Sequence, residues 1–233
     1  MPRSSPPVQL TREALLGDAI RALVEATDPT VRLLSPEEHR ASLQAALDLR
    51  PERGDVWIFA YGSLIWNPLI RFVEKRIATV HGYHRRFCLW THVGRGTSSK
   101  PGLLLGLEHG GACRGVAYRV AAEEAAQELE ILWRREMITG AYAPRWVTAR
   151  TAAGPVLAIA FLINRRHPRY AGDLPEKRIV AAIAEAQGPL GDCATYLFNT
   201  VAHLDELGIR DVKLRSLRDR VAARLQANGR TLP

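Results

Sequence analysis

A short turn that follows an apolar segment is the first part of the sequence that could bind a ligand. Val56 to Phe59 are β-forming residues without a charge, which is typical of a strand buried on both faces. They lead into Tyr61-Gly62-Ser63-Leu64. A glycine at this position tolerates positive φ and a close approach to the main chain, and successive N–H groups in such a turn can form an anion-binding concavity. The same residues also fit an ordinary turn in which Ser63 bonds its own backbone.

A carboxylate on an apolar helix face is the second candidate. The pattern over residues 121–137 predicts a helix, and Glu136 shares the apolar face of that helix because it lies three residues beyond Trp133. Burial raises the pKa of a carboxyl group, and the negative end of the helix dipole acts in the same direction. Such a carboxylate is a candidate general base. The alternative is that Glu136 only pairs with a nearby arginine, such as Arg134 or Arg145.

Helices are expected at both ends of the chain. Thr11 is a candidate N-cap for a helix that runs to about Ala26. Ser35-Pro36-Glu37-Glu38 is a capping box, which predicts a second helix that runs to about Leu49. We expect these two helices to pack on the main domain or to mediate self-association. Three further helices are predicted after the strands, over residues 175–186, 194–207 and 211–227.

Strands are expected between these helical regions. Residues 77–91 predict one or two strands broken at Gly82, and a polar loop follows at 95–102. Leu103 to Leu107 and Arg114 to Val120 predict two more strands, with Gly110-Gly111 as the hairpin turn between them. Residues 145–150 and 156–163 predict a second hairpin.

Composition limits the class of protein. The chain has 233 residues, of which 47% are apolar, and contains no uncharged apolar run long enough to span a membrane. We therefore expect a soluble protein, with no secretion signal at its start. The formal charge is +8, but the arginines are interleaved with acidic residues, which indicates a solvated surface rather than a nucleic-acid site.

Cysteine and histidine spacing gives little sign of a metal site. Cys88, Cys113 and Cys193 are far apart and form no Cys-x-x-Cys pair, which indicates buried thiols in a reducing compartment such as the cytoplasm. His81 and His84 have a spacing seen in metal ligands. In a strand, however, residues three apart face opposite sides, so we predict no metal there.

Several segments together resemble the ChaC-like family of glutathione-specific γ-glutamylcyclotransferases. The resemblance covers nearly the whole chain from about Leu10, and the order and spacing of the segments carry it. The segments are Phe59 to Pro68, Arg85-Arg86-Phe87, Arg95-Gly96-Thr97 with Lys100-Pro101-Gly102, Arg114 to Arg119, Arg135-Glu136-Met137 with Gly140-Ala141-Tyr142, Gly188-Pro189-x-Gly191, Tyr196-Leu197 and Gly208-Ile209.

The resemblance implies an α+β fold, a small mixed β-barrel with flanking helices. It divides the chain into an N-terminal helical extension, 1–54, and a γ-glutamylcyclotransferase-like domain, 55–227. It also implies that glutathione is the substrate, that 5-oxoproline and cysteinylglycine are the products, and that no metal, nucleotide or redox cofactor is needed. The alternatives are a cyclotransferase of the same fold that acts on other γ-glutamyl amines or dipeptides, and a non-catalytic regulatory or binding module.

The expected site residues follow from the two candidates and the resemblance. Glu136 is the expected catalytic base. The substrate-binding residues are expected at and after the turn, with three further residues as candidates for contact with the cysteinylglycine half. The first set is Tyr61, Gly62, Ser63, Leu64, Ile65 and Trp66, and the second is Arg85, Thr97 and Tyr196.

Overall fold

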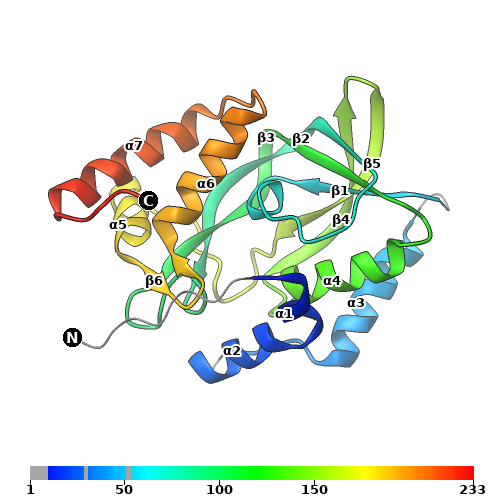
Figure 1. The fold of residues 1–233 in the computed structure, drawn as a ribbon, viewed down its shortest axis with the longest axis horizontal. Coiled ribbons are helices and arrows are strands. Elements are labelled where there is room, and N and C mark those ends of the chain that lie inside the picture. Colours follow the sequence, from blue (N-terminus) through cyan, green and yellow to red (C-terminus); the bar gives the residue numbers. More distant parts are fainter. Residues whose placement is uncertain (1–9, 29–30, 51–53) are drawn as a thin grey trace.

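The protein forms a closed β-barrel with helices outside it (Figure 1). The structure is a computed structural model, which describes residues 10–28, 31–50 and 54–233. The barrel order is β1-β3-β2-β4-β5. The strands are β1 (Val56–Ala60), β2 (Glu74–Thr91), β3 (Gly102–Val120), β4 (Tyr142–Thr151) and β5 (Gly154–Ile163), and a separate small sheet contains β6 (Gln187–Gly188) and β7 (Gly191–Asp192).

The pairing of the strands is mixed. β1 is antiparallel to β3 but parallel to β5, and this parallel contact closes the barrel. β1 is buried as its composition predicts, since Val56, Ile58, Phe59 and Ala60 are all inaccessible to solvent and only Trp57 is partly exposed. The small mixed barrel of the predicted α+β fold is therefore confirmed, and so is the β4–β5 hairpin.

The predicted hairpin at Gly110-Gly111 is wrong. β3 is one strand that continues through both glycines, and it pairs with β2, which is likewise one strand. Gly110 and Gly111 have φ values of 106° and 70°, and Gly82 in β2 has a φ of 83° beside a shift in register. The positive-φ glycines therefore bend two paired strands together, as bulges do, and do not reverse the chain.

The N-terminal helices differ from the prediction at one point. The expected helix over 11–26 is divided into α1 (Arg12–Leu16) and α2 (Ala19–Thr27), because Asp18 between them adopts a left-handed conformation with a φ of 55°. α3 (Pro36–Asp48) begins at Ser35 with the complete capping box, as predicted.

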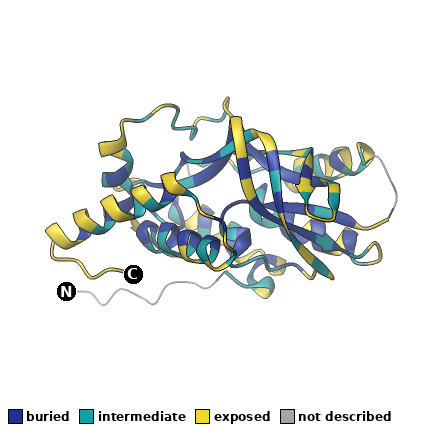
Figure 2. Cartoon of the chain, turned by 90° about the horizontal axis from the view of Figure 1, so that it is seen from above, coloured by how far each residue is buried: buried dark blue, intermediate teal, exposed yellow. Residues whose placement is uncertain are grey.

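The other helices agree with the sequence patterns. α4 (Ala125–Glu136) starts four residues later than expected, and α5 (Glu176–Glu185), α6 (Cys193–Glu206) and α7 (Val212–Ala227) follow the predicted ranges. α5, α6 and α7 pack together on one side of the barrel, whereas α1 and α3 pack against α4 on another (Figure 1). Buried residues concentrate in the strands and on the inward faces of the helices (Figure 2). None of the helices in the described ranges is long and apolar enough to cross a membrane.

The predicted N-terminal extension lies directly on the barrel domain. α1 contacts α4, and α3 contacts both α4 and β4. Residues 1–9 of the extension lie outside the described residues, and a boundary at residue 54 stays a prediction.

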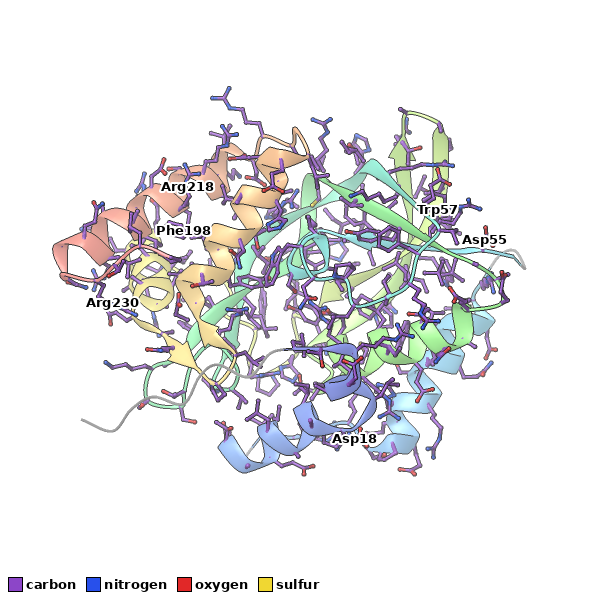
Figure 3. The ribbon with its side chains drawn as sticks, in the orientation of Figure 1. Asp18, Asp55, Trp57, Phe198, Arg218 and Arg230 are labelled. Carbon is purple, nitrogen blue, oxygen red and sulfur yellow. The ribbon has the colours of Figure 1, made fainter. Side chains whose placement is uncertain are left out.

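A buried carboxylate in α4 holds α1 in place. Glu128 is inaccessible to solvent and accepts two hydrogen bonds of 2.6 Å from the guanidinium of Arg12. The backbone N–H of Arg71 donates a third, at 2.9 Å. Burial acts to raise the pKa of Glu128, but these hydrogen bonds and charges outweigh it and lower that pKa. Asp18, labelled in Figure 3, adds a more exposed ion pair of 2.8 Å with Arg134.

We predict that Arg12→Met lowers the free energy of unfolding by about 3 kcal/mol at neutral pH, because it leaves the buried Glu128 carboxylate without its charged partner. The carboxyl has a lowered folded-state pKa, so its stabilising effect is present above its unfolded-state pKa and is lost as the pH falls. Urea unfolding of both proteins at several pH values measures the difference, which should shrink in acid.

Arg40→Met is the matched control for this experiment. Arg40 pairs with Glu37 on the exposed face of α3, where ion pairs contribute only about 0 to 1 kcal/mol. An equal loss of stability in both variants would contradict the role given to the buried pair.

Candidate active site

The turn after β1 forms a short 3-10 helix, η1 (Ser63–Ile65). The N–H of Ile65 donates to the carbonyl oxygen of Gly62 at 2.9 Å and closes this helix. The N–H groups of residues 62–64 have no hydrogen-bond acceptor among the described residues. These three donors are therefore available to a ligand, as an anion-binding turn requires.

Gly62 is required for a different reason from the one predicted. Its φ is −134°, so the expected positive φ is wrong. The expected close approach is present, but it is made by the protein itself: a Cβ atom at this position would lie 3.0 Å from the hydroxyl oxygen of Tyr196. The absence of a side chain thus lets Tyr196 reach the turn.

Glu136 is the last residue of α4, and its neighbour Arg135 connects it to the turn. The carboxylate Oε1 of Glu136 lies 3.0 Å from Nε of Arg135, and the two side chains are only 14% and 6% exposed. Nη2 of Arg135 donates to Oγ of Ser63 at 2.9 Å, and Nη1 donates to the carbonyl oxygen of Asn67. One buried guanidinium therefore holds the end of α4 against η1.

The structure shows an arginine partner for Glu136 and a raised pKa, whereas its role as a base stays a prediction. It does pair with an arginine, although this is Arg135 and neither Arg134 nor Arg145. Burial nevertheless raises the pKa of Glu136, and the charge and hydrogen bond of Arg135 oppose that rise only partly. Burial also lowers the pKa of Arg135. The carboxyl thus has the raised pKa that a proton-transferring group needs.

Three tyrosines line the same cleft as the carboxylate, of which Tyr61 and Tyr196 are buried and Tyr142 is half-buried. Burial is the main cause that raises the pKa of Tyr61, Tyr142 and Tyr196, and the negative charge of Glu136 adds to the rise in each case. Their hydroxyls are therefore neutral. Tyr61 donates to the carbonyl oxygen of Phe161 at 2.6 Å, and Tyr142 donates to that of Leu105 at 2.8 Å.

Two connected hollows meet at these residues. A narrow cleft of about 20 Å³ is lined by residues 61–64 together with Glu136, Tyr142 and Tyr196. A larger cavity of about 890 Å³ shares Ser63, Glu136 and the same two tyrosines. Its far wall is formed by α1 and α2 of the N-terminal extension. The cleft has room for about one water-sized group, whereas the cavity, which also reaches Ser63 and Glu136, can hold a small molecule.

The structure brings together most of the residues expected at the site. Tyr61, Gly62, Ser63, Leu64, Tyr196 and Glu136 line the narrow cleft, and Trp66 lines the larger cavity.

Three of the expected residues lie elsewhere. Ile65 is buried and does not line either hollow. Arg85 supports the turn from behind: its Nη1 donates to the carbonyl oxygen of Tyr61 at 2.7 Å and its Nε lies 3.0 Å from Asp211. Thr97 accepts a hydrogen bond from the N–H of Lys100 within its own loop. The predicted contacts of these side chains with a substrate are therefore not supported by their positions.

Sequence reasoning missed several polar residues of the cavity, among them Arg95, Arg135, Tyr142 and Arg169. Arg95, Arg135 and Tyr142 belong to segments on which the resemblance rests, but none of them is among the predicted site residues. Arg95 and Arg169 lie in polar loops that carry no periodic signal. No pattern indicates that their side chains turn inward.

Comparison with known proteins identifies the family of this chain. The sequence model of the ChaC-like protein family matches residues 56–224. The chain is 44% identical over 209 residues to the glutathione-specific gamma-glutamylcyclotransferase of Escherichia coli K12, which covers 89% of this chain and 90% of the relative. It is 33% identical over 196 residues to the glutathione-specific gamma-glutamylcyclotransferase 1 of Rattus norvegicus, with 79% and 88% covered.

A solved structure agrees with the fold. The crystal structure of the gamma-glutamyl cyclotransferase specific to glutathione from yeast matches with a TM-score of 0.67 and 21% identity, over 73% of this chain and 96% of that one. The chain belongs to the ChaC-like family. The resemblance found in the sequence is thereby confirmed.

We predict that Arg135→Met raises the pKa of Glu136 further, because it removes the positive charge that opposes the effect of burial. The titration can be followed through the NMR signal of the side-chain carboxyl carbon. This signal is assigned by its disappearance in Glu136→Gln.

Arg134→Met provides the control, since Arg134 pairs with Asp18 and Glu130 on the outer face of the same helix. It should leave the titration of Glu136 unchanged. An unaltered pKa in Arg135→Met would show that the guanidinium does not govern this carboxyl.

Proposed function

We propose that this chain is a glutathione-specific γ-glutamylcyclotransferase, a carbon–nitrogen lyase that converts glutathione into 5-oxoproline and cysteinylglycine. The observation that carries the proposal is the position of Glu136, which is buried and faces the donor-rich turn across one cleft. The similarity to the Escherichia coli relative supports the choice of substrate.

Glu136 is proposed as the base that starts the reaction. The α-amine of the γ-glutamyl group attacks the γ-carbonyl carbon of the same residue, and only the neutral amine can do so. An amine of ordinary pKa is mostly protonated at neutral pH, so a neighbouring group must accept its proton. A carboxylate with a raised pKa accepts a proton more readily than an ordinary one does.

The same carboxyl completes the reaction. The new bond joins the amine nitrogen to the γ-carbon, and the amide bond to the cysteinyl nitrogen breaks. The attacking nitrogen loses two protons in all, one before the attack and one from the tetrahedral intermediate, and the departing nitrogen gains two and leaves as an ammonium. Glu136 can carry each proton in turn, so the proton balance closes without another reactant. Both reacting groups belong to one molecule, and a site that holds the γ-glutamyl chain folded beside Glu136 supplies much of the rate by proximity.

The turn is proposed to stabilise the negative charge of the intermediate. Attack on the carbonyl places negative charge on its oxygen, where preorganised N–H donors are most effective. Residues 62–64 line the cleft with Glu136, and their N–H groups have no acceptor among the described residues. They can bind this oxygen or the substrate's α-carboxylate.

Ser63 is not proposed as a nucleophile. Its Oγ accepts a hydrogen bond from Arg135, and no histidine in the described ranges lines either hollow. A serine nucleophile needs an adjacent base of that kind. Its part in the site is to hold the guanidinium that contacts Glu136.

The reducing interior of the cell is proposed as the setting of the protein. Cys88, Cys113 and Cys193 are all buried free thiols, the state expected where disulfides do not form. Cell fractionation should recover the protein with the cytoplasm, and recovery from a secreted fraction would contradict this.

We predict that Glu136→Gln lowers the rate of 5-oxoproline release from glutathione by about 10²-fold to 10⁴-fold, the usual contribution of a general base. The amide keeps the shape of the side chain and cannot take the proton. Chromatographic assay of 5-oxoproline and cysteinylglycine measures the change, with circular dichroism to show that the variant is folded.

Glu130→Gln is the control, because Glu130 lies half-exposed on the same helix and pairs only with Arg134 among the described residues. It should retain full activity. Full activity in Glu136→Gln would exclude Glu136 as the base.

The substrate class needs a separate comparison. Equal rates on glutathione and γ-glutamyl-alanine would favour a cyclotransferase of broader range. Glutathione binding without turnover in the native chain would favour a non-catalytic module.

A further inference from the structure

Four arginines line the large cavity, and within the described ranges two of them are ion-paired. Arg12 contacts Glu128 and Arg135 contacts Glu136, whereas the ion pairs of the described residues include neither Arg95 nor Arg169. Glutathione has two carboxylates, one beside the reacting amine and one on the terminal glycine. The cavity therefore has positive charge available for an anionic ligand.

Arg95 is largely occupied by the protein. Its Nη1 donates to the carbonyl oxygen of Asp192 at 3.0 Å. Its guanidinium also lies 5.8 Å from the ring centre of Trp66 and 5.5 Å from that of Tyr196. These contacts fix Arg95 on the side of the cavity near the turn.

Arg169 has a donor that the protein leaves unused. Its Nη2 donates to Oγ1 of Thr139, but its Nε is buried and has no hydrogen-bond partner among the described residues. Leaving a buried charged donor unpaired is unfavourable, and such a group is normally satisfied by a partner. Nε and a neighbouring Nη of an arginine form the fork that binds a carboxylate through two hydrogen bonds.

The backbone around Arg169 holds this side chain in position. The carbonyl oxygen of Arg169 accepts a hydrogen bond from the N–H of Trp90 at 2.9 Å, and its own N–H donates to Nδ1 of His167 at 3.2 Å. These bonds fix the backbone of the loop, and the bond from Nη2 to Thr139 holds the guanidinium on the cavity wall, which reduces the entropy lost on binding.

Arg169 lies where it could contact the end of a tripeptide whose other end is beside Glu136. Arg169 lines the large cavity but not the narrow cleft that contains Glu136. The hydroxyl of Tyr142 is within electrostatic range of both groups. A ligand with its γ-glutamyl end beside Glu136 can thus extend through the large cavity past Tyr142 toward Arg169. The carboxylate of Asp28 also acts on Arg169 through space and offsets part of its positive charge.

We propose that Arg169 binds the carboxylate of the terminal glycine and so selects glutathione over γ-glutamyl compounds that lack this group. The inference rests on the proposed function, since it needs the γ-glutamyl end at Glu136. Arg169 is assigned to substrate selection, with no part in proton transfer.

Binding by the Glu136→Gln variant tests the proposal without turnover. Titration calorimetry with glutathione and with its glycine amide compares ligands that differ only in the terminal carboxylate. We expect glutathione to bind at least about tenfold more tightly, as is common for charged hydrogen bonds. Adding Arg169→Met should remove this preference by weakening only the binding of glutathione.

Kinetics in the otherwise native protein provide the second measurement. Arg169→Met should lower kcat/KM for glutathione by at least about tenfold and leave that for the amide nearly unchanged. Arg169→Lys keeps the charge without the fork and should recover part of the loss. Arg166→Met, at an exposed position of the same loop, should match the native protein on both ligands.

The outcomes separate a failure of the inference about Arg169 from a failure of the proposed function. Equal losses on both ligands would mean that Arg169 has only a structural role, and loss of the preference in Arg95→Met instead would assign the carboxylate to Arg95. Either result overturns the inference and leaves the proposed function intact. Turnover of neither ligand by the native protein would overturn the proposed function, while the calorimetric preference would still decide the role of Arg169.

Discussion

The site depends on one buried guanidinium. Arg135 contacts the carboxylate of Glu136, the hydroxyl of Ser63 and the carbonyl oxygen of Asn67. A charge in such a position is costly unless oppositely charged and polar groups satisfy it, so each partner is needed for the others to stay buried. The distance between the proposed base and the turn is therefore set by the fold, before any substrate is present.

Local signals account for most of the elements that the sequence allowed us to predict. The capping box at Ser35 and the burial of β1 depend on neighbouring residues, and both are present. The errors arose where a distant partner decides the outcome. Gly110 and Gly111 fit a hairpin as well as a bent strand, and only the pairing with β2 selects the second.

The site was predictable to the extent that its residues interrupt a pattern. Glu136 was found because a carboxylate on an apolar helix face is exceptional. Arg135 lies about 100° further round the same helix, where a charge usually faces solvent. It is buried only because η1, about seventy residues earlier, covers it. The sequence around Arg169 does not indicate that its side chain faces the cavity, because contacts with β2 fix the shape of its loop.

The wall of the large cavity has a consequence for how relatives of this protein can diverge. Glu136 and the turn lie within the region matched by the family, whereas α1 and α2, which close the far side of the cavity, precede it. Part of the cavity wall is thus encoded in a different stretch of the chain from the proposed base and the turn. Replacements before β1 can therefore change the space open to a ligand during evolution without altering the residues proposed to transfer the proton.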